Sequence, residues 1–154
     1  MIWLNSQKFG HFKDLSGHSA VPYLLVFQTA DKGLASTQDA AKKAATSAAQ
    51  AWLALVDKGD SAESWKTGAH SFKNALSQEQ WGQALRAARI PLGKTLSRKL
   101  LSQSYETSLT GAPDGEYVVI QYDASFEGKK VATETVTPVL DSDGVWRVSG
   151  YNIE

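Results

Sequence analysis

The chain of 154 residues contains no cysteine. Disulfide bonds, cysteine-ligated metals and thiol chemistry are therefore excluded. Because proteins without cysteine occur on either side of a membrane, the compartment stays open. The three histidines, His11, His18 and His70, are too scattered for a metal motif, and we expect surface roles for them. The sequence accordingly predicts no metal site and no cofactor.

Net charge is also missing, since 16 basic side chains balance 16 acidic ones. This balance argues against a partner such as nucleic acid or an anionic membrane surface. The charges are nevertheless segregated, with five bases and no acid between Gln80 and Tyr105. We interpret these bases as a solvated helix face that is neutralised across the fold, and the alternative is a binding site for an anion. Nucleic acid would need aromatic residues among the bases, and only Trp81 lies there.

Long hydrophobic runs are absent from the first thirty residues, where the most concentrated run covers residues 20–27. Eight residues cannot span a bilayer, so we expect no stable membrane span. We interpret residues 1–35 as an N-terminal arm or a degenerate export segment. Lys8 and Lys13 precede the run as in a signal peptide, but Pro22 within it is atypical. A disordered arm, an extra strand docked on the domain and a start codon assigned too far upstream are alternatives.

Apolar residues at helical spacing begin the regular domain, which we place at residues 36–154 as a single unit. A first helix is expected from about Ser36 to Gly59, with alanines in its first half and larger residues such as Trp52 later. Gly59 would end it as a left-handed cap. A second, short helix follows and carries Trp65. We expect Trp52 and Trp65 to face each other where the chain folds back.

A third helix is predicted to begin at Ser77, where Ser-Gln-Glu-Gln is typical of a capping box, and to end before Pro91 and Gly93. Beyond it the apolar pattern changes to a period of two, which is typical of strands. Turns rich in Gly and Asp separate the strand candidates. These candidates are residues 98–109, 117–126, 131–140 and 145–153.

These elements predict an α+β fold, with three N-terminal helices packed on a curved four-stranded antiparallel meander sheet. The long first helix is the expected cover of one sheet face. A bulge at Gly150 is expected to bring Trp146 and Tyr151 to the same face as the last strand curves. The other face would stay open, with Val119 or Val136 on it, and a homodimer through this face is a hypothesis.

Four separated segments carry a resemblance to a known family. They read AWLALVDKGDSAESW, RIPLGKTLSRKL, PDGEYVVIQYDASFE and TETVTPVLDSDGVWRVSGYNI. Together they resemble the bacterial family called domain of unknown function 4019, over about residues 40–153. The resemblance implies the cone-shaped fold of nuclear transport factor 2-like and cystatin-like proteins. Members of the family often look exported, which favours an exported or periplasmic location. No activity is implied, because the broader fold hosts isomerases, dehydratases, small-ligand carriers and dimerisation modules.

Recognisable catalytic motifs are lacking: there is no Gly-rich phosphate loop and no nucleophile elbow. The sequence Asp-Ser-Asp-Gly at residues 141–144 resembles the start of a calcium loop. Val145 and Arg147 occupy the next ligand positions, so a hairpin turn is the better interpretation.

An isomerase of the ketosteroid type would need a carboxylate base and an acid donor inside an apolar cone. Asp123 and Glu134 are the carboxylates on candidate strands, and Tyr105 and Tyr122 are the candidate donors. The alternative is that Glu134 pairs with a base such as Arg98 and that the tyrosines belong to the core. No catalytic residue is therefore assigned.

We predict a non-catalytic module that binds an unknown small apolar ligand or a protein partner. A small cofactor-free enzyme of the isomerase or dehydratase type, acting in the cone pocket, is the alternative. The ligand-pocket candidates are Trp52, Trp65, Tyr105, Tyr122, Glu134 and Trp146.

Overall fold

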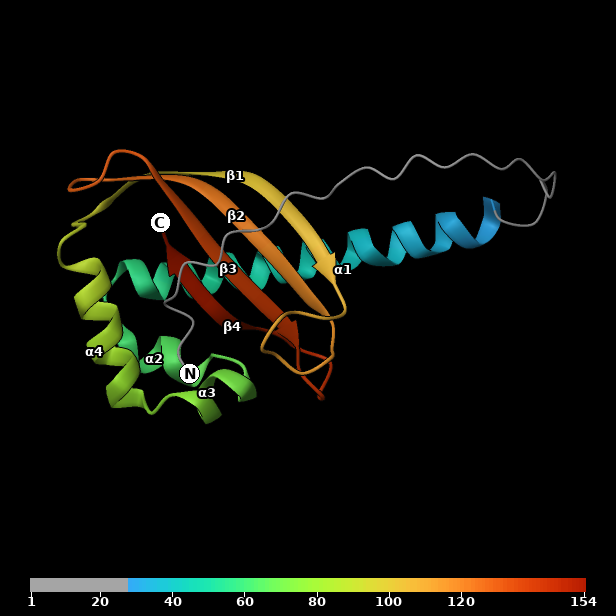
Figure 1. Cartoon of the computed structure of the whole chain (residues 1–154), viewed down its shortest axis with the longest axis horizontal. Coiled ribbons are helices and arrows are strands. Elements are labelled where there is room, and N and C mark those ends of the chain that lie inside the picture. Colours follow the sequence, from blue (N-terminus) through green and yellow to red (C-terminus); the bar gives the residue numbers. More distant parts are fainter. Residues whose placement is uncertain (1–27) are drawn as a thin grey trace.

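The computed structural model describes residues 28–154, so most of the segment interpreted as an arm lies outside the described residues. Helices come first along the chain and strands follow (Figure 1). The helices are α1 (Gln28–Asp57), α2 (Ser61–Lys66), α3 (His70–Ala75) and α4 (Gln78–Arg89). The strands are β1 (Thr95–Glu106), β2 (Tyr117–Phe126), β3 (Ala132–Leu140) and β4 (Trp146–Ile153).

The first helix begins before the expected cap at Ser36. Thr37 does not cap a helix end, because its hydroxyl donates to the Gly33 carbonyl one turn earlier within α1, at 2.8 Å. The amino-terminal part of α1 extends past the sheet in Figure 1, and residues 33–40 are exposed. The other end behaves as predicted, since Gly59 follows it with a φ of 74°.

The expectation of three helices is wrong, because α3 is a fourth helix in the described part of the chain. With six residues it is too short to show a helical period. Its N-cap residue, Ala69, has no side chain that could signal a helix start. The Ala69 amide instead donates to the Val148 carbonyl on β4 at 2.8 Å, and Phe72 is buried. Tertiary contacts therefore stabilise this helix.

The third predicted helix is α4, and its capping box is confirmed. The Gln80 amide donates to the Ser77 hydroxyl at 3.2 Å, and the Ser77 amide donates to the Gln80 side chain at 2.9 Å. These bonds satisfy amides that have no partner inside the helix.

The four strands form one antiparallel sheet in the order β1-β2-β3-β4, as the sequence predicts. β2 has the predicted bounds, and β3 and β4 each begin one residue after the predicted start. β1 lies earlier than predicted, because its pairing with β2 shifts register between Thr95 and Ser97 and again between Leu100 and Ser102. Such bulges interrupt the alternation from which strand positions are predicted.

The expected bulge in β4 is confirmed. Gly150 pairs with Thr137, whereas Val148 pairs with the adjacent Pro138, so Ser149 is the extra residue. Trp146, Val148 and Tyr151 consequently all contact the main core cluster, and Ile153 contacts the smaller one.

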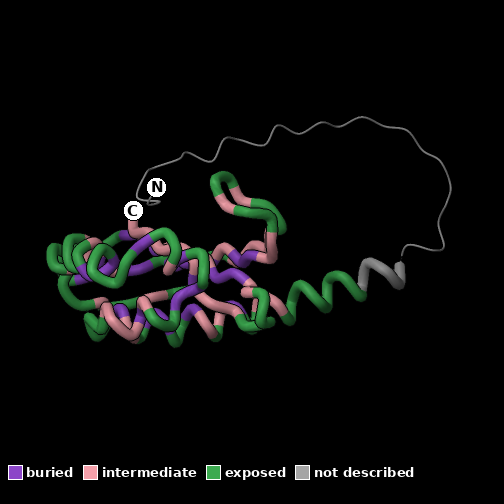
Figure 2. The backbone as a smooth tube through the Cα atoms, turned by 90° about the horizontal axis from the view of Figure 1, so that it is seen from below, coloured by how far each residue is buried: buried purple, intermediate pink, exposed green. Residues whose placement is uncertain are grey.

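The core lies between α1 and the inner face of the sheet, while α2, α3 and α4 close one end (Figures 1 and 2). Trp52 makes ring contacts with Phe72, Trp81 and Tyr151, at centroid distances of 6.4, 5.6 and 5.3 Å. Trp65, which the sequence predicts to face Trp52, is not among these aromatic neighbours. The Trp65 indole donates instead to the Leu76 carbonyl at 2.7 Å.

The outer face of the sheet is polar rather than apolar. Val136 pairs with Ile120 and is fully buried, so its placement on the open face is wrong. Val119 is half-buried, and the outward residues of β3 are threonines. Among the described residues, no helix combines the length and hydropathy needed to cross a bilayer.

Candidate functional site

A group of charged and hydroxyl side chains lies where the end of α1 meets the end of α4 and one end of the sheet. We call this group the polar cluster. It consists of Asp57, Arg89, Thr95, Arg98, Glu134 and Tyr151.

Glu134 is the buried centre of the polar cluster, with no exposed surface. Arg98 donates from Nε to one carboxylate oxygen at 2.5 Å and from Nη2 to the other at 3.1 Å. The Tyr151 hydroxyl donates to the second oxygen at 2.7 Å, and Arg89 Nη1 lies 3.6 Å from that oxygen. The predicted pairing of Glu134 with Arg98 is therefore confirmed.

Asp57 is the second carboxylate of the polar cluster. Arg98 donates to both of its oxygens, at 2.8 and 3.0 Å, and Arg89 donates to one of them at 2.9 Å. The Thr95 hydroxyl adds a bond of 3.0 Å. Burial alone would raise the pKa of Asp57, but the bonds and charges of Arg98, with Thr95 and Arg89, outweigh burial and hold that pKa below its usual range.

Charges in the polar cluster cancel, since two carboxylates face two guanidinium groups. Burial raises the pKa of the Tyr151 hydroxyl, and the neighbouring Glu134 charge raises it further. Arg89 also lies over the Phe126 ring, 5.0 Å from its centroid. These contacts confirm that the bases at residues 86–99 are partly neutralised across the fold.

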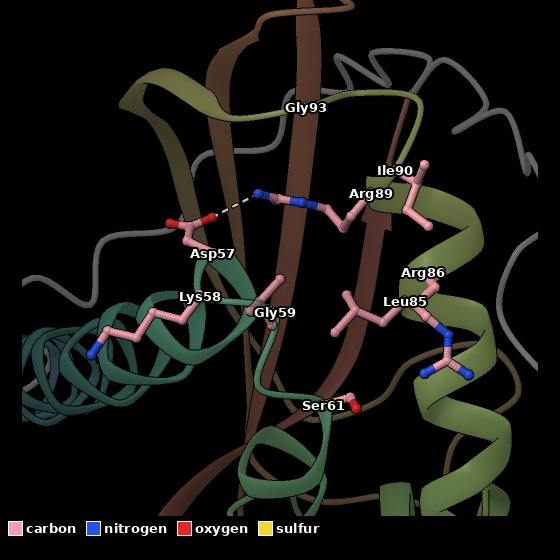
Figure 3. Close-up of a pocket in the computed structure, with 10 residues that line it drawn as sticks. Asp57, Lys58, Gly59, Ser61, Leu85, Arg86, Arg89, Ile90 and Gly93 are labelled. Carbon is pink, nitrogen blue, oxygen red and sulfur yellow. Dashed lines mark hydrogen bonds and ion pairs between the residues drawn. The ribbon is translucent and has the colours of Figure 1, made fainter.

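An open groove lies beside the polar cluster, between α4 and the turn that joins α1 to α2 (Figure 3). Its volume is about 420 Å³. Leu85 and Arg86 of α4 lie across from Gly59 and Ser61 of the turn, and Asp57 with Arg89 forms one wall (Figure 3). A second hollow of about 370 Å³ continues from it and shares Ser61 and Arg86.

The six pocket candidates from the sequence do not line this groove. Trp52 and Tyr122 are buried in the core. Trp65, Tyr105 and Trp146 are half-buried at its edge. Glu134 lies in the polar cluster. Their assignment to an apolar ligand pocket stays a prediction.

Tyr122 differs from the other buried tyrosines, because its hydroxyl has no hydrogen-bond partner among residues 28–154. Only 4% of the residue is exposed. Burial raises the pKa of this hydroxyl, and the nearby Arg98 charge opposes that effect only in part. An unpaired buried hydroxyl lowers the free energy of unfolding, so a hydroxyl in this state is unusual in a folded protein.

Four members of the polar cluster were not among the site candidates from the sequence, namely Asp57, Arg89, Thr95 and Tyr151. One feature of the sequence does indicate a role for Asp57. An acid at the carboxyl end of a helix opposes the helix dipole, and the last turn of α1 has no base that would compensate Asp57. Such an acid indicates a cationic partner from another element.

The turn between β3 and β4 is a hairpin turn, as predicted, and Gly144 has a φ of 79°. Arg147 binds Asp141 at 3.1 Å and Asp143 at 2.8 Å. His70 is exposed as expected, and its Nδ1 lies 3.1 Å from the Asp141 carboxylate. The hydrogen bond with Arg147 lowers the pKa of Asp143 to about 2. The contact between His70 and Asp141 joins α3 to this turn.

Comparison with protein families gives one match, to the family described as protein of unknown function DUF4019, over residues 48–151. The chain belongs to this family. The matched residues include the whole polar cluster and the whole groove. Comparisons with curated proteins and with solved structures gave no significant match. Family membership therefore agrees with the resemblance found in the sequence and names no activity.

Proposed function

We propose that this chain is a non-catalytic module that binds a ligand or a protein partner, on a cone fold of the nuclear transport factor 2-like or cystatin-like type. The curved sheet that wraps one long helix supports the fold proposal. The state of the buried carboxylate supports the function proposal, as the next paragraph explains.

A general base needs a carboxylate that is free to accept a proton from a substrate. Both oxygens of Glu134 are instead occupied by Arg98, and Tyr151 takes a further position on one of them. The other candidate base, Asp123, is exposed. It lies opposite Lys99 on β1 and Thr133 on β3, on the face of the sheet that points away from α1. Neither carboxylate is arranged as a base inside the cone.

The alternative is a small cofactor-free enzyme of the isomerase or dehydratase type. The unpartnered Tyr122 hydroxyl favours it, because a buried phenol with a free proton could serve as an acid donor. Its cross-strand neighbour is Glu134, whose oxygens are occupied. The donor is present and the matching base is absent among the described residues.

A homodimer stays a prediction. The polar outer face argues against that face as its interface, because stable homodimer interfaces are more apolar than the rest of the surface. Sedimentation of the full chain at micromolar concentration tests for the dimer.

Titration of the side-chain carboxyls by carbon-detected NMR tests the proposed function in the full chain. A binding module needs no carboxyl poised near neutral pH, so we expect none to titrate above about pH 6. A carboxyl that titrates above that value would identify a candidate base and contradict the proposal.

A further inference from the structure

The groove beside α4 adjoins the second hollow, and Ser61 and Arg86 line both. Gly59 lies on one wall, and a Cβ placed there would meet nothing within 4 Å. Gly93 lies at the other end with a φ of 69°. The Glu127 side chain occupies the space beside Gly93, so only the bare backbone at Gly59 leaves room for another chain to approach closely.

The groove has an excess of positive charge. Lys58 and Arg86 form no ion pair with any residue in the described part of the chain. The nearby Asp57 does not offset them, since Arg89 and Arg98 already neutralise it. The second hollow also contains the acid Glu79, so the two hollows together hold one more cation than acid. Figure 3 shows the Lys58 side chain pointing away from α4, so an acidic partner would need one carboxylate at Lys58 and another at Arg86.

Apolar side chains flank these cations. Val56 and Leu85 are buried at the base of the groove, and Ile90 at its edge is 74% exposed. Both hollows are partly open to solvent. A small molecule in such a site would bury only part of its surface, whereas tight small-ligand sites bury most of it. Openness and mixed chemistry together favour a segment that a larger partner carries.

We propose that this groove binds an acidic segment of a partner protein, with carboxylates at Lys58 and Arg86 and an apolar side chain against Ile90. The inference rests on the proposed binding function and names the class of partner. The chain's own N-terminal segment is a poor candidate for the occupant, because residues 1–27 carry Lys8, Lys13 and a single acid, Asp14.

The test uses isotope-labelled full chain and three pools of short synthetic peptides. In the first pool, acidic residues alternate with Leu or Phe. In the second, every acid is replaced by Lys, and in the third, every Leu or Phe is replaced by Ser. We expect the first pool to shift the amide signals of residues 58–61 and 85–90, and the other two pools to shift them far less.

Two double variants locate the binding site. Lys58→Gln with Arg86→Gln removes the groove cations, and we expect its affinity for the first pool to fall by about tenfold or more, as for loss of charged hydrogen bonds. Lys99→Gln with Lys130→Gln removes the same charge from exposed positions outside the groove, and we expect its affinity to stay within about twofold. Equal loss in both variants would overturn the proposal.

Other outcomes would also overturn it. Acetate or inorganic phosphate that shifts the same amides with the affinity of the peptides would assign the groove to a free anion. Binding of anionic phospholipid vesicles that depends on Lys58 and Arg86, without peptide binding, would assign it to a membrane surface. Absence of binding at millimolar peptide would refute the groove as a peptide site, while the carboxyl titration would still decide whether the chain is a non-catalytic module.

Discussion

Arg98 on β1 and Glu134 on β3 form a bidentate ion pair across the intervening strand β2. Nε and Nη2 of Arg98 each donate to one of the two carboxylate oxygens. The pair can form because Ala124 on β2 lies opposite both Arg98 and Ala132. Small side chains there leave room for the guanidinium to reach over β2. The same guanidinium then binds Asp57 at the end of α1, so one side chain ties the helix to two strands.

Replacing Arg98 should destabilise the fold strongly. In Arg98→Met, the Glu134 charge would stay buried without its main partner, and breaking a buried pair in this way costs about 3–5 kcal/mol. The double variant Arg98→Met with Glu134→Met removes both charges, and its loss should be smaller than that of Arg98→Met alone. Chemical denaturation measures both values. A loss below about 1 kcal/mol for Arg98→Met would show that the pair is not what holds these elements together.

Removing the Tyr122 hydroxyl should leave stability unchanged or raise it. Tyr122→Phe deletes a buried group that has no partner among the described residues, and such a group costs about 1–3 kcal/mol. Tyr151→Phe is the matched control. Its hydroxyl donates to Glu134 and accepts from Arg89, so its loss should destabilise the protein. The free energy of unfolding should therefore fall for Tyr151→Phe and stay unchanged or rise for Tyr122→Phe. A clear destabilisation by Tyr122→Phe would reveal a bound partner for that hydroxyl.

The fold was predictable wherever local pattern and tertiary structure agree. Residues 118–126 alternate between buried and more exposed positions, and turns bound the strand, so both ends of β2 were predicted. The strand β1 lies earlier in the chain than predicted, because two bulges break the alternation of its residues. α3 was missed, because a six-residue helix that is anchored through Ala69 depends on contacts with β4. The residues of α3 alone do not predict such contacts.

The polar cluster was only partly predictable for a related reason. Pairing of Glu134 with Arg98 could be suggested from charge alone. Asp57, Arg89 and Tyr151 join them only because five separate elements converge at one end of the sheet. The groove depends on that convergence too, since it lies between the end of α1 and the end of α4. Sequence spacing does not report how two helix ends meet.

Stability should fall in acid as Asp57 becomes protonated. The pKa of Asp57 is held below its ordinary value of about 3.9, so the unfolded chain binds more protons in the window between the two pKa values. The stabilising contribution is therefore complete above about pH 4 and is lost as the pH falls through the lower, folded-state pKa. Denaturation curves recorded from neutral to acid pH measure the effect. Asp57→Asn cannot ionise, so its curve should be flatter in that window, and an equal slope would contradict the assignment.

Gly128 should tolerate no larger side chain, because the β2–β3 turn packs directly on the link between α4 and β1. Its amide donates to the Leu92 carbonyl at 2.8 Å, and an added Cβ would overlap the Pro91 carbonyl oxygen. That obstacle is backbone, which cannot move aside by changing a rotamer. Gly128→Ala should therefore cost about 1–3 kcal/mol, as overpacking does in other proteins.

The matched control for this substitution is Gly33→Ala in the exposed part of α1. A Cβ at Gly33 would meet nothing within 4 Å, and alanine is favoured over glycine inside a helix by up to about 1 kcal/mol. The two Gly→Ala variants should thus move the denaturation midpoint in opposite directions, or leave it unchanged for Gly33→Ala. Because Gly93, at one end of the groove, follows Pro91 and Leu92, Gly128→Ala should also shift the amide signals of residues 89–95. Unchanged stability and unchanged amide signals for Gly128→Ala would show that the β2–β3 turn does not pack on the link between α4 and β1.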